Sequence, residues 1–132
     1  MTTTLLTISP SHLQLRDAIE YPKAGVLSKV LLQDSYCRYT LFCLAASTEI
    51  YEHTAARNAT INVLEGRGTL TLEGEDIELE TGVFIVMPAH IPHTLKAETN
   101  LAFLLTLSEQ SHTLKAETNL AFLLSFSKQP RT

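Results

Sequence analysis

The chain has 132 residues, a formal net charge of -4 at neutral pH and a hydrophobic share of 45%. This length suits one domain with its own core and is too short for two. The composition is that of a globular protein and excludes general disorder. Because Lys and Arg form no cluster that could follow a phosphate backbone, we expect no nucleic-acid partner.

No apolar run approaches the roughly 18 residues of a membrane span, so we expect no membrane insertion. The first residues also lack the basic-then-apolar pattern of a secretory signal. The chain is therefore expected to be cytoplasmic.

The first elements in chain order are an arm and two strands. Residues 1–25 show no clean period and are interrupted by Pro10, so we expect a surface arm with one or two short strands, in which His12 is exposed. Residues 26–33 and 39–46 have the composition of strands, with a turn at Asp34-Ser35 between them. Since the second strand is apolar on both faces, it should be covered on both sides.

The two cysteines, Cys37 and Cys43, belong to this second strand region. Six positions of extended chain span about 20 Å, at ~3.3 Å per residue. A disulfide needs Cα atoms within about 7 Å, so none is expected. Cys43, between Phe42 and Leu44, is predicted to be a small core side chain.

Residues 47–59 are the least regular stretch in the middle of the chain. Residues 60–64 return to a strand pattern, with Ala59, Ile61 and Val63 on one face. Further along, Gly74-Glu75-Asp76 predicts a hairpin turn between two short strands. The acidic residues of this hairpin alternate with inward-facing Ile77 and Leu79, which indicates a solvated surface rather than a cation site.

Residues 83–87 form a further short strand, which ends before Pro88. Glycines punctuate the turns between these strands, where positive φ angles are needed. Short strands at this spacing predict a small all-β barrel or sandwich.

The C-terminal part contains one internal repeat. Residues 93–108 recur at 112–127, and the copies differ only at Thr106/Ser125 and Leu107/Phe126. Two copies are too few for a solenoid, and a closed barrel has one position for such a strand. The second copy must therefore lie on a sheet edge, pair with another subunit or stay loose.

Because its LAFLL segment is strongly apolar, we expect the second copy to be paired, in a homodimer or by strand exchange. We divide the chain into an arm (1–25), a barrel (26–108) and a duplicated loop-plus-strand element (109–132). Sizing a chain truncated after Ser108 tests this prediction. An unchanged oligomeric state and stability would count against it.

Residues 47–66 resemble the first signature motif of the cupin superfamily, in its small, single-domain, RmlC-like form. That motif is a Gly, five residues, His-any-His, three or four residues, Glu, six residues and Gly. Here Ser47 occupies the first Gly position, His53 the first His position and Gly66 the last position. Ala55 and Ala59 replace the second His and the Glu.

Residues 82–97 resemble the second cupin motif, which is a Gly, five residues, Pro, any residue, Gly, two residues, His, three residues and Asn. Gly82, Pro88 and His93 are in register, while His90 replaces the inner Gly and Ala97 the Asn. The resemblance implies an all-β double-stranded β-helix, or jelly-roll barrel, with a central pocket. The duplicated C-terminal strand is additional to this fold.

The resemblance also implies a divalent metal held by three His and one Glu, of which only His53 and His93 remain. Two imidazoles make a weak site, so we expect either no metal or a weakly held Zn, Ni, Mn or Fe. Tyr51, Glu49 or a Cys side chain could add a donor. His90 is a further candidate, although an offset of three on an extended chain separates it from the face of His93. The turn between the two prolines can override that.

The predicted pocket residues are His53, His93, Tyr51, Phe84 and Tyr39. His53 is either a pocket-lining ligand or general base, or a histidine at the barrel mouth bonded to a backbone carbonyl. His112 is expected at the surface. Arg57 and Arg67 can attract an anionic ligand, but arginines in loops are usually solvated.

Three functions compete, and the sequence leaves open whether the chain is an enzyme. The first is a cupin that binds a small ligand in its pocket, which the depleted ligand set favours. The second is a metal-dependent oxygenase or isomerase with a substituted ligand set. The third is a dimeric partner or regulatory protein. Metal analysis of a His53→Ala/His93→Ala variant separates the first two.

Overall fold

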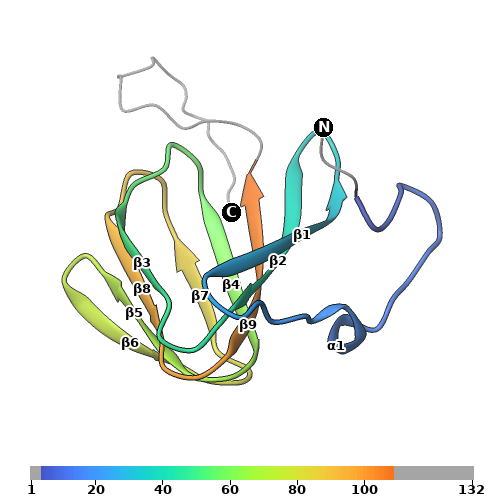
Figure 1. Cartoon of the computed structure of the whole chain (residues 1–132). Coiled ribbons are helices and arrows are strands. Elements are labelled where there is room, and N and C mark those ends of the chain that lie inside the picture. The colour runs from blue at the N-terminus through green and yellow to red at the C-terminus, as the bar shows by residue number, and fades with distance from the viewer. Residues whose placement is uncertain (1–3, 109–132) are drawn as a thin grey trace, which may run out of the picture.

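The structure is a computed structural model that describes residues 4–108, apart from the side chains of Glu52 and His53 (Figure 1). The described part of the chain has one short helix and is otherwise built from strands, which confirms the predicted all-β class. In chain order the elements are α1 Leu15–Ala18, β1 Val26–Gln33, β2 Cys37–Leu44, β3 Glu49–His53, β4 Ala59–Glu65, β5 Gly68–Leu72, β6 Glu75–Leu79, β7 Phe84–Met87, β8 His93–Ala97 and β9 Leu101–Ser108.

The strands form two antiparallel sheets. One has the order β1-β2-β9-β4-β7 and the other has the order β3-β8-β5-β6. Figure 1 shows them as the two walls of one barrel. The main hydrophobic core lies between them, since Ile61 and Val63 from the first sheet pack with Leu70, Leu79 and Leu95 from the second. This is the jelly-roll arrangement that the sequence predicted.

Strands β2 and β4 follow the predicted burial. Alternate side chains of β4, from Ala59, Ile61 and Val63, are buried in the core. Strand β2 is covered on both faces, because Leu44 packs in the core while Leu41 packs in a second cluster on the outer face of the sheet. Both predictions are confirmed.

The cysteines are both free. Cys43 is completely buried in the outer cluster, and burial raises the pKa of its thiol. The prediction of a core cysteine without a disulfide is confirmed.

The N-terminal arm covers the outer face of the five-stranded sheet. Its apolar side chains, including Leu13, Leu15 and Ile19, pack against the outer cluster. Tyr21 Oη donates a hydrogen bond of 2.6 Å to Glu65, and burial together with this bond raises the tyrosine pKa. The prediction of strands in the arm is wrong for its described residues, which contain only α1. Besides this packing, the Leu5 and Leu6 N–H groups donate hydrogen bonds to the carbonyls of Val30 and Leu31 in β1. His12 is exposed as expected.

The structure differs in detail from two local predictions. The irregular stretch before Ala59 contains strand β3, whose pairing with β8 shifts register between Ile50 and His53. The hairpin turn lies at Glu73-Gly74, one residue earlier than predicted, because Leu72 pairs with Glu75. Ile77 and Leu79 face inward and the acidic side chains are exposed, as predicted.

The first copy of the repeat supplies β8 and β9. Strand β9 lies between β2 and β4, and β8 lies between β3 and β5. The second copy, residues 112–127 with His112, lies outside the described residues, and its pairing stays a prediction. Within residues 4–108 there is no helix with the length and hydrophobicity of a membrane span.

Candidate functional site

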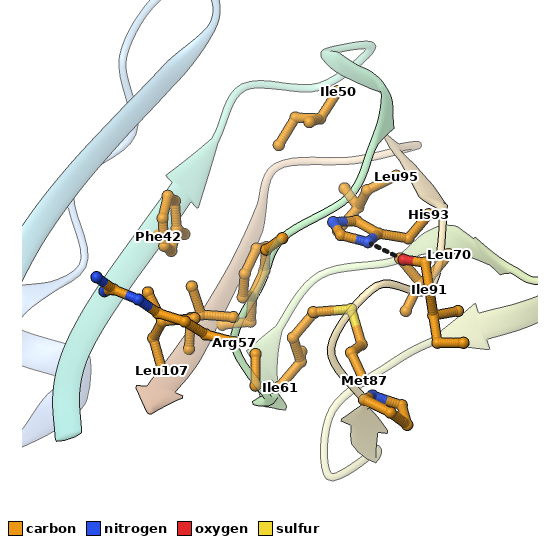
Figure 2. Close-up of a pocket in the computed structure, with 15 residues that line it drawn as sticks. Phe42, Ile50, Arg57, Ile61, Leu70, Met87, Ile91, His93, Leu95 and Leu107 are labelled. Atoms are coloured by element: carbon orange, nitrogen blue, oxygen red, sulfur yellow. Dashed lines mark hydrogen bonds between the residues drawn. The ribbon is translucent and has the colours of Figure 1, made fainter. Parts of the chain in front are cut away.

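A cavity of about 260 Å³ lies inside the barrel (Figure 2). Of the fifteen residues that line it, two carry polar side-chain groups, Arg57 and His93. The remaining thirteen are Phe42, Ile50, Ala55, Ala59, Ile61, Leu70, Met87, Pro88, Ile91, Leu95, Phe103, Leu105 and Leu107. The cavity therefore offers a ligand a mainly apolar surface with two polar points.

The four positions at which the cupin motifs have glycine all have a positive φ angle. Gly66 and Gly82 have φ angles of 95°. Ser47 and His90, which replace glycines, have φ angles of 73° and 72°. Residues other than glycine rarely adopt this left-handed region. Ser47 and His90 thus keep the turn geometry of the glycines they replace, which supports the motif register independently of residue identity.

Three of the four positions of the motif's metal ligands line the cavity. His93, Ala55 and Ala59 all line it. The pairing of β3 with β8 sets His53 opposite His93, while the side chain of His53 lies outside the described residues. Two of the four positions therefore present a methyl group where the motif has a metal donor.

His93 lies at the start of β8 and is half-buried. Its Nδ1 donates a hydrogen bond of 3.2 Å to the carbonyl of Ile91 (Figure 2). Because a carbonyl oxygen can only accept, Nδ1 carries the proton, and Nε2 of the neutral ring is an acceptor.

Arg57 lies in the loop between β3 and β4 and is half-buried. Hydrogen bonds join this loop to the turn before β8. The carbonyl of Ala55 accepts from the His90 N–H at 2.7 Å, and Asn58 Oδ1 accepts from the Ala89 N–H at 2.7 Å. Figure 2 shows Arg57 on the side of Phe42 and Leu107, across the cavity from His93.

The Cupin domain family model matches residues 40–118. The match spans more than half of the chain and includes both motif segments. This chain belongs to the cupin family. No curated protein matches it.

Solved cupin-like structures agree with this assignment. A conserved protein of unknown function from Streptococcus pyogenes is 28% identical, with a TM-score of 0.70 over 83% of this chain and 97% of that chain. A cupin superfamily protein from Desulfitobacterium hafniense is 22% identical, with a TM-score of 0.71 over 83% of this chain and 99% of that chain, and shows the fold alone. A cupin 2 conserved barrel domain protein from Leptotrichia buccalis is 29% identical, with a TM-score of 0.67 over 73% of this chain and 47% of that chain.

Three predicted pocket aromatics do not line the cavity of this cupin. Tyr51 is 74% exposed, since its neighbour Ile50 faces the cavity and adjacent strand residues face opposite sides. Phe84 is 62% exposed for the same reason, because Ile85 and Met87 of β7 face inward. Tyr39 packs against the outer cluster. These placements correct the sequence prediction.

His90 is a turn residue and does not line the cavity. Its backbone N–H donates a hydrogen bond to the Ala55 carbonyl of the neighbouring loop. His90 as a metal ligand is therefore not supported by its position.

The predicted pocket set did not include Arg57, Phe42 and Phe103, which line the cavity, although Arg57 was named as a residue that can attract an anionic ligand. Arg57 could have been found, because it lies between two motif positions that face the pocket. Phe42 could have been found by counting in twos along β2 from buried Leu44. Phe103 lies in the apolar first copy of the repeat, where no alternation of polar and apolar residues shows which side chains face inward.

The remaining donors do not fit the metal site that the family implies. Alanine at positions 55 and 59 supplies no ligand atom. Among the described side chains, no group of three from His, Cys, Asp and Glu converges on one point. Among the described side chains at the four motif positions, His93 alone carries a donor atom, where three or four protein ligands normally hold an ion.

Proposed function

We propose that this cupin binds a small, mainly apolar molecule in its barrel cavity and holds no metal ion tightly. The observation that carries the proposal is that Ala55 and Ala59, at two ligand positions of the family motif, line a cavity with eleven other apolar residues. The same two positions thus lack the metal-donor atoms of the motif and contribute apolar surface to the cavity wall.

The size of the cavity supports a compact ligand. A dry apolar cavity of about 150 Å³ is large enough for benzene. The 260 Å³ of this cavity therefore accommodates a ring with substituents. Apolar contact drives such binding, while a few polar groups orient the ligand. Arg57 and His93 are in position for the second role.

The alternative function, a metal-dependent oxygenase or isomerase, needs at least one donor beyond His53 and His93. The described residues that line the cavity do not include such a donor. The binding function is therefore the one that the site supports best.

Methionine NMR can test the binding proposal directly. The chain has two methionines, Met1 and Met87, and Met87 lines the cavity. In protein with ¹³C-labelled methionine methyl groups, titration with toluene should shift the Met87 signal saturably, with a Kd of about 1 mM or lower. Met1 should not respond.

Two neighbouring alanines provide a matched control. Ala55 lines the cavity, whereas Ala56 is exposed and does not. The Ala55→Leu variant should weaken toluene binding at least about tenfold, because the added volume occupies the site. The Ala56→Leu variant should bind as the wild type does. Equal binding by the two variants, or a Met87 signal that never shifts, contradicts the proposal.

Elemental analysis tests the second half of the proposal. Protein purified without chelator should contain well below one equivalent of Fe, Mn, Ni or Zn. A stoichiometric ion that is lost in the His53→Ala/His93→Ala variant would instead establish a metal-dependent cupin.

A further inference from the structure

The two copies of the C-terminal repeat are similar enough to close the barrel in the same way. Residues 93–108 supply β8 and β9, and residues 112–127, which lie outside the described residues, repeat them with two differences. We propose that the barrel closes in two alternative forms, the first with residues 93–108 and the second with residues 112–127 of the same chain. The second form places Phe126 in the cavity wall where the first form has Leu107.

The buried residues of the first copy all recur in the second. In the first copy they are Leu95, Ala97 and residues 101–103, which pack in the two hydrophobic clusters. The residues at the same places in the second copy are identical. Because the free energy of burial depends on the side chain that is buried, the second copy would gain the same packing in the same place.

The turn between β8 and β9 is also the same in both copies. In the first copy Thr99 Oγ1 accepts a hydrogen bond of 2.9 Å from the Arg67 N–H. Asn100 Oδ1 accepts one of 3.0 Å from the Ala46 N–H. The second copy has the same Glu-Thr-Asn sequence at residues 117–119. It therefore carries the side chains that fix this turn as well as those that fill the core.

The two differences between the copies lie where the barrel can accept them. Thr106 and Leu107 are half-buried near the end of β9, and Ser125 and Phe126 replace them in the second copy. Leu107 borders the cavity of about 260 Å³, so the larger ring of Phe126 has space to enter. The second form would then have the smaller cavity. A ligand that needs the full volume would favour the first form, a consequence that rests on the proposed function.

The connection between β7 and β8 decides which form predominates. It has 5 residues (88–92) in the first form and would have 24 (88–111) in the second. This lengthening lowers the probability that the ends of the loop meet roughly tenfold. In either form one apolar copy lies outside the positions of β8 and β9, so its cost does not separate them. We expect the second form in roughly a tenth of the chains.

Aspartate substitutions in the full-length chain test the exchange. Leu101 is completely buried, so an aspartate there excludes the first copy from the barrel. The Leu101→Asp variant should keep a cooperative thermal transition, with a Tm lower by roughly 5–10 °C, because Leu120 takes its place. The matched variant Leu120→Asp should unfold as the wild type does. The double variant should have no cooperative transition, since neither copy can close the barrel.

Two results of this series would overturn the proposal. One is loss of the cooperative transition in Leu101→Asp alone, and the other is a double variant that unfolds as Leu101→Asp does. The Tm of Leu101→Asp should also be independent of protein concentration. A Tm that rises with concentration would place the second copy in another chain and overturn closure within one chain. None of these measurements needs a bound ligand, so their failure leaves the proposed function standing.

Met87 reports which copy borders the cavity. Met87 and Leu107 both pair with Ala59, from opposite sides, and all three line the cavity. In protein with ¹³C-labelled methionine methyl groups, the ring of Phe126 should shift the Met87 signal of the Leu101→Asp variant. Adding Phe126→Leu to that variant should remove the shift. The wild type should show the shifted signal at roughly a tenth of the intensity. A Met87 signal that is the same with Phe126 and with leucine there overturns the second form.

Discussion

The two segments that carry the cupin motifs differ in which features of those motifs they retain. Both keep the left-handed turns of the family, at Ser47 and Gly66 in the first segment and at Gly82 and His90 in the second. The second segment also keeps His93 at the cavity, whereas alanines occupy two donor positions of the first.

This difference distinguishes what closing the barrel requires from what binding a metal ion requires. Closing the barrel depends on the backbone path through its turns, which serine and histidine can follow at a modest cost in free energy. Holding an ion depends on donor atoms, which alanine lacks. The turns of the family fold can therefore persist where two donor positions of its motif hold alanine.

The largest effect is expected on the free energy of unfolding, when one glycine from each segment is replaced by alanine. A Cβ on Gly66 would lie 2.0 Å from the carbonyl oxygen of Asn100, while a Cβ on Gly82 would meet nothing within 4 Å. Both residues have the same φ of 95°. Gly66→Ala should lower the free energy of unfolding by about 3 kcal/mol or more, and Gly82→Ala by about 1–2 kcal/mol. Urea unfolding measures both, and equal losses would contradict the steric difference.

The next largest effect is expected when substitutions restore the missing donor atoms of the first segment. The Ala55→His/Ala59→Glu variant should bind one divalent ion, because it recreates the family's ligand set around His93. With Zn²⁺ or Ni²⁺ at a hundredfold excess over its Kd, binding should raise the Tm of this variant by roughly 10 °C. Differential scanning calorimetry with and without the metal measures the shift.

The matched control for restored donors is Ala56→His/Ala59→Glu, in which the new histidine is outside the cavity wall. Its Tm should not respond to metal in the same range. If both variants respond alike, the ion binds at the surface and the assignment of Ala55 to a ligand position is wrong.

The smallest effect concerns the left-handed turns themselves. Ser47→Gly and His90→Gly should each stabilise the protein by about 0.5–1 kcal/mol, since glycine adopts a positive φ without a steric penalty. Chemical denaturation measures the gain. Ser35, which is exposed in a turn without a positive φ, is the control, and Ser35→Gly should give no gain. A loss of stability in both test variants would show that side-chain contacts outweigh backbone strain there.

Sequence alone predicted most of the strands and the motif register. Strand β1 has the predicted bounds, and the inward faces of β4 and β6 are those that alternation indicated. These features depend on a residue and its near neighbours, because side chains alternate along any strand and glycine permits any turn. The identity of the family came from the same local patterns.

Only the tertiary structure decided which side chains form the cavity. Phe42 and Phe103 meet because β2 pairs with β9, and Arg57 is placed by a loop bonded to the turn that precedes β8. The described part of the arm contains α1 in place of the expected strands, and its apolar side chains pack on the outer face of the sheet. Pairings between segments distant in the sequence set these positions. A local sequence pattern does not specify which distant segment a strand or loop will contact.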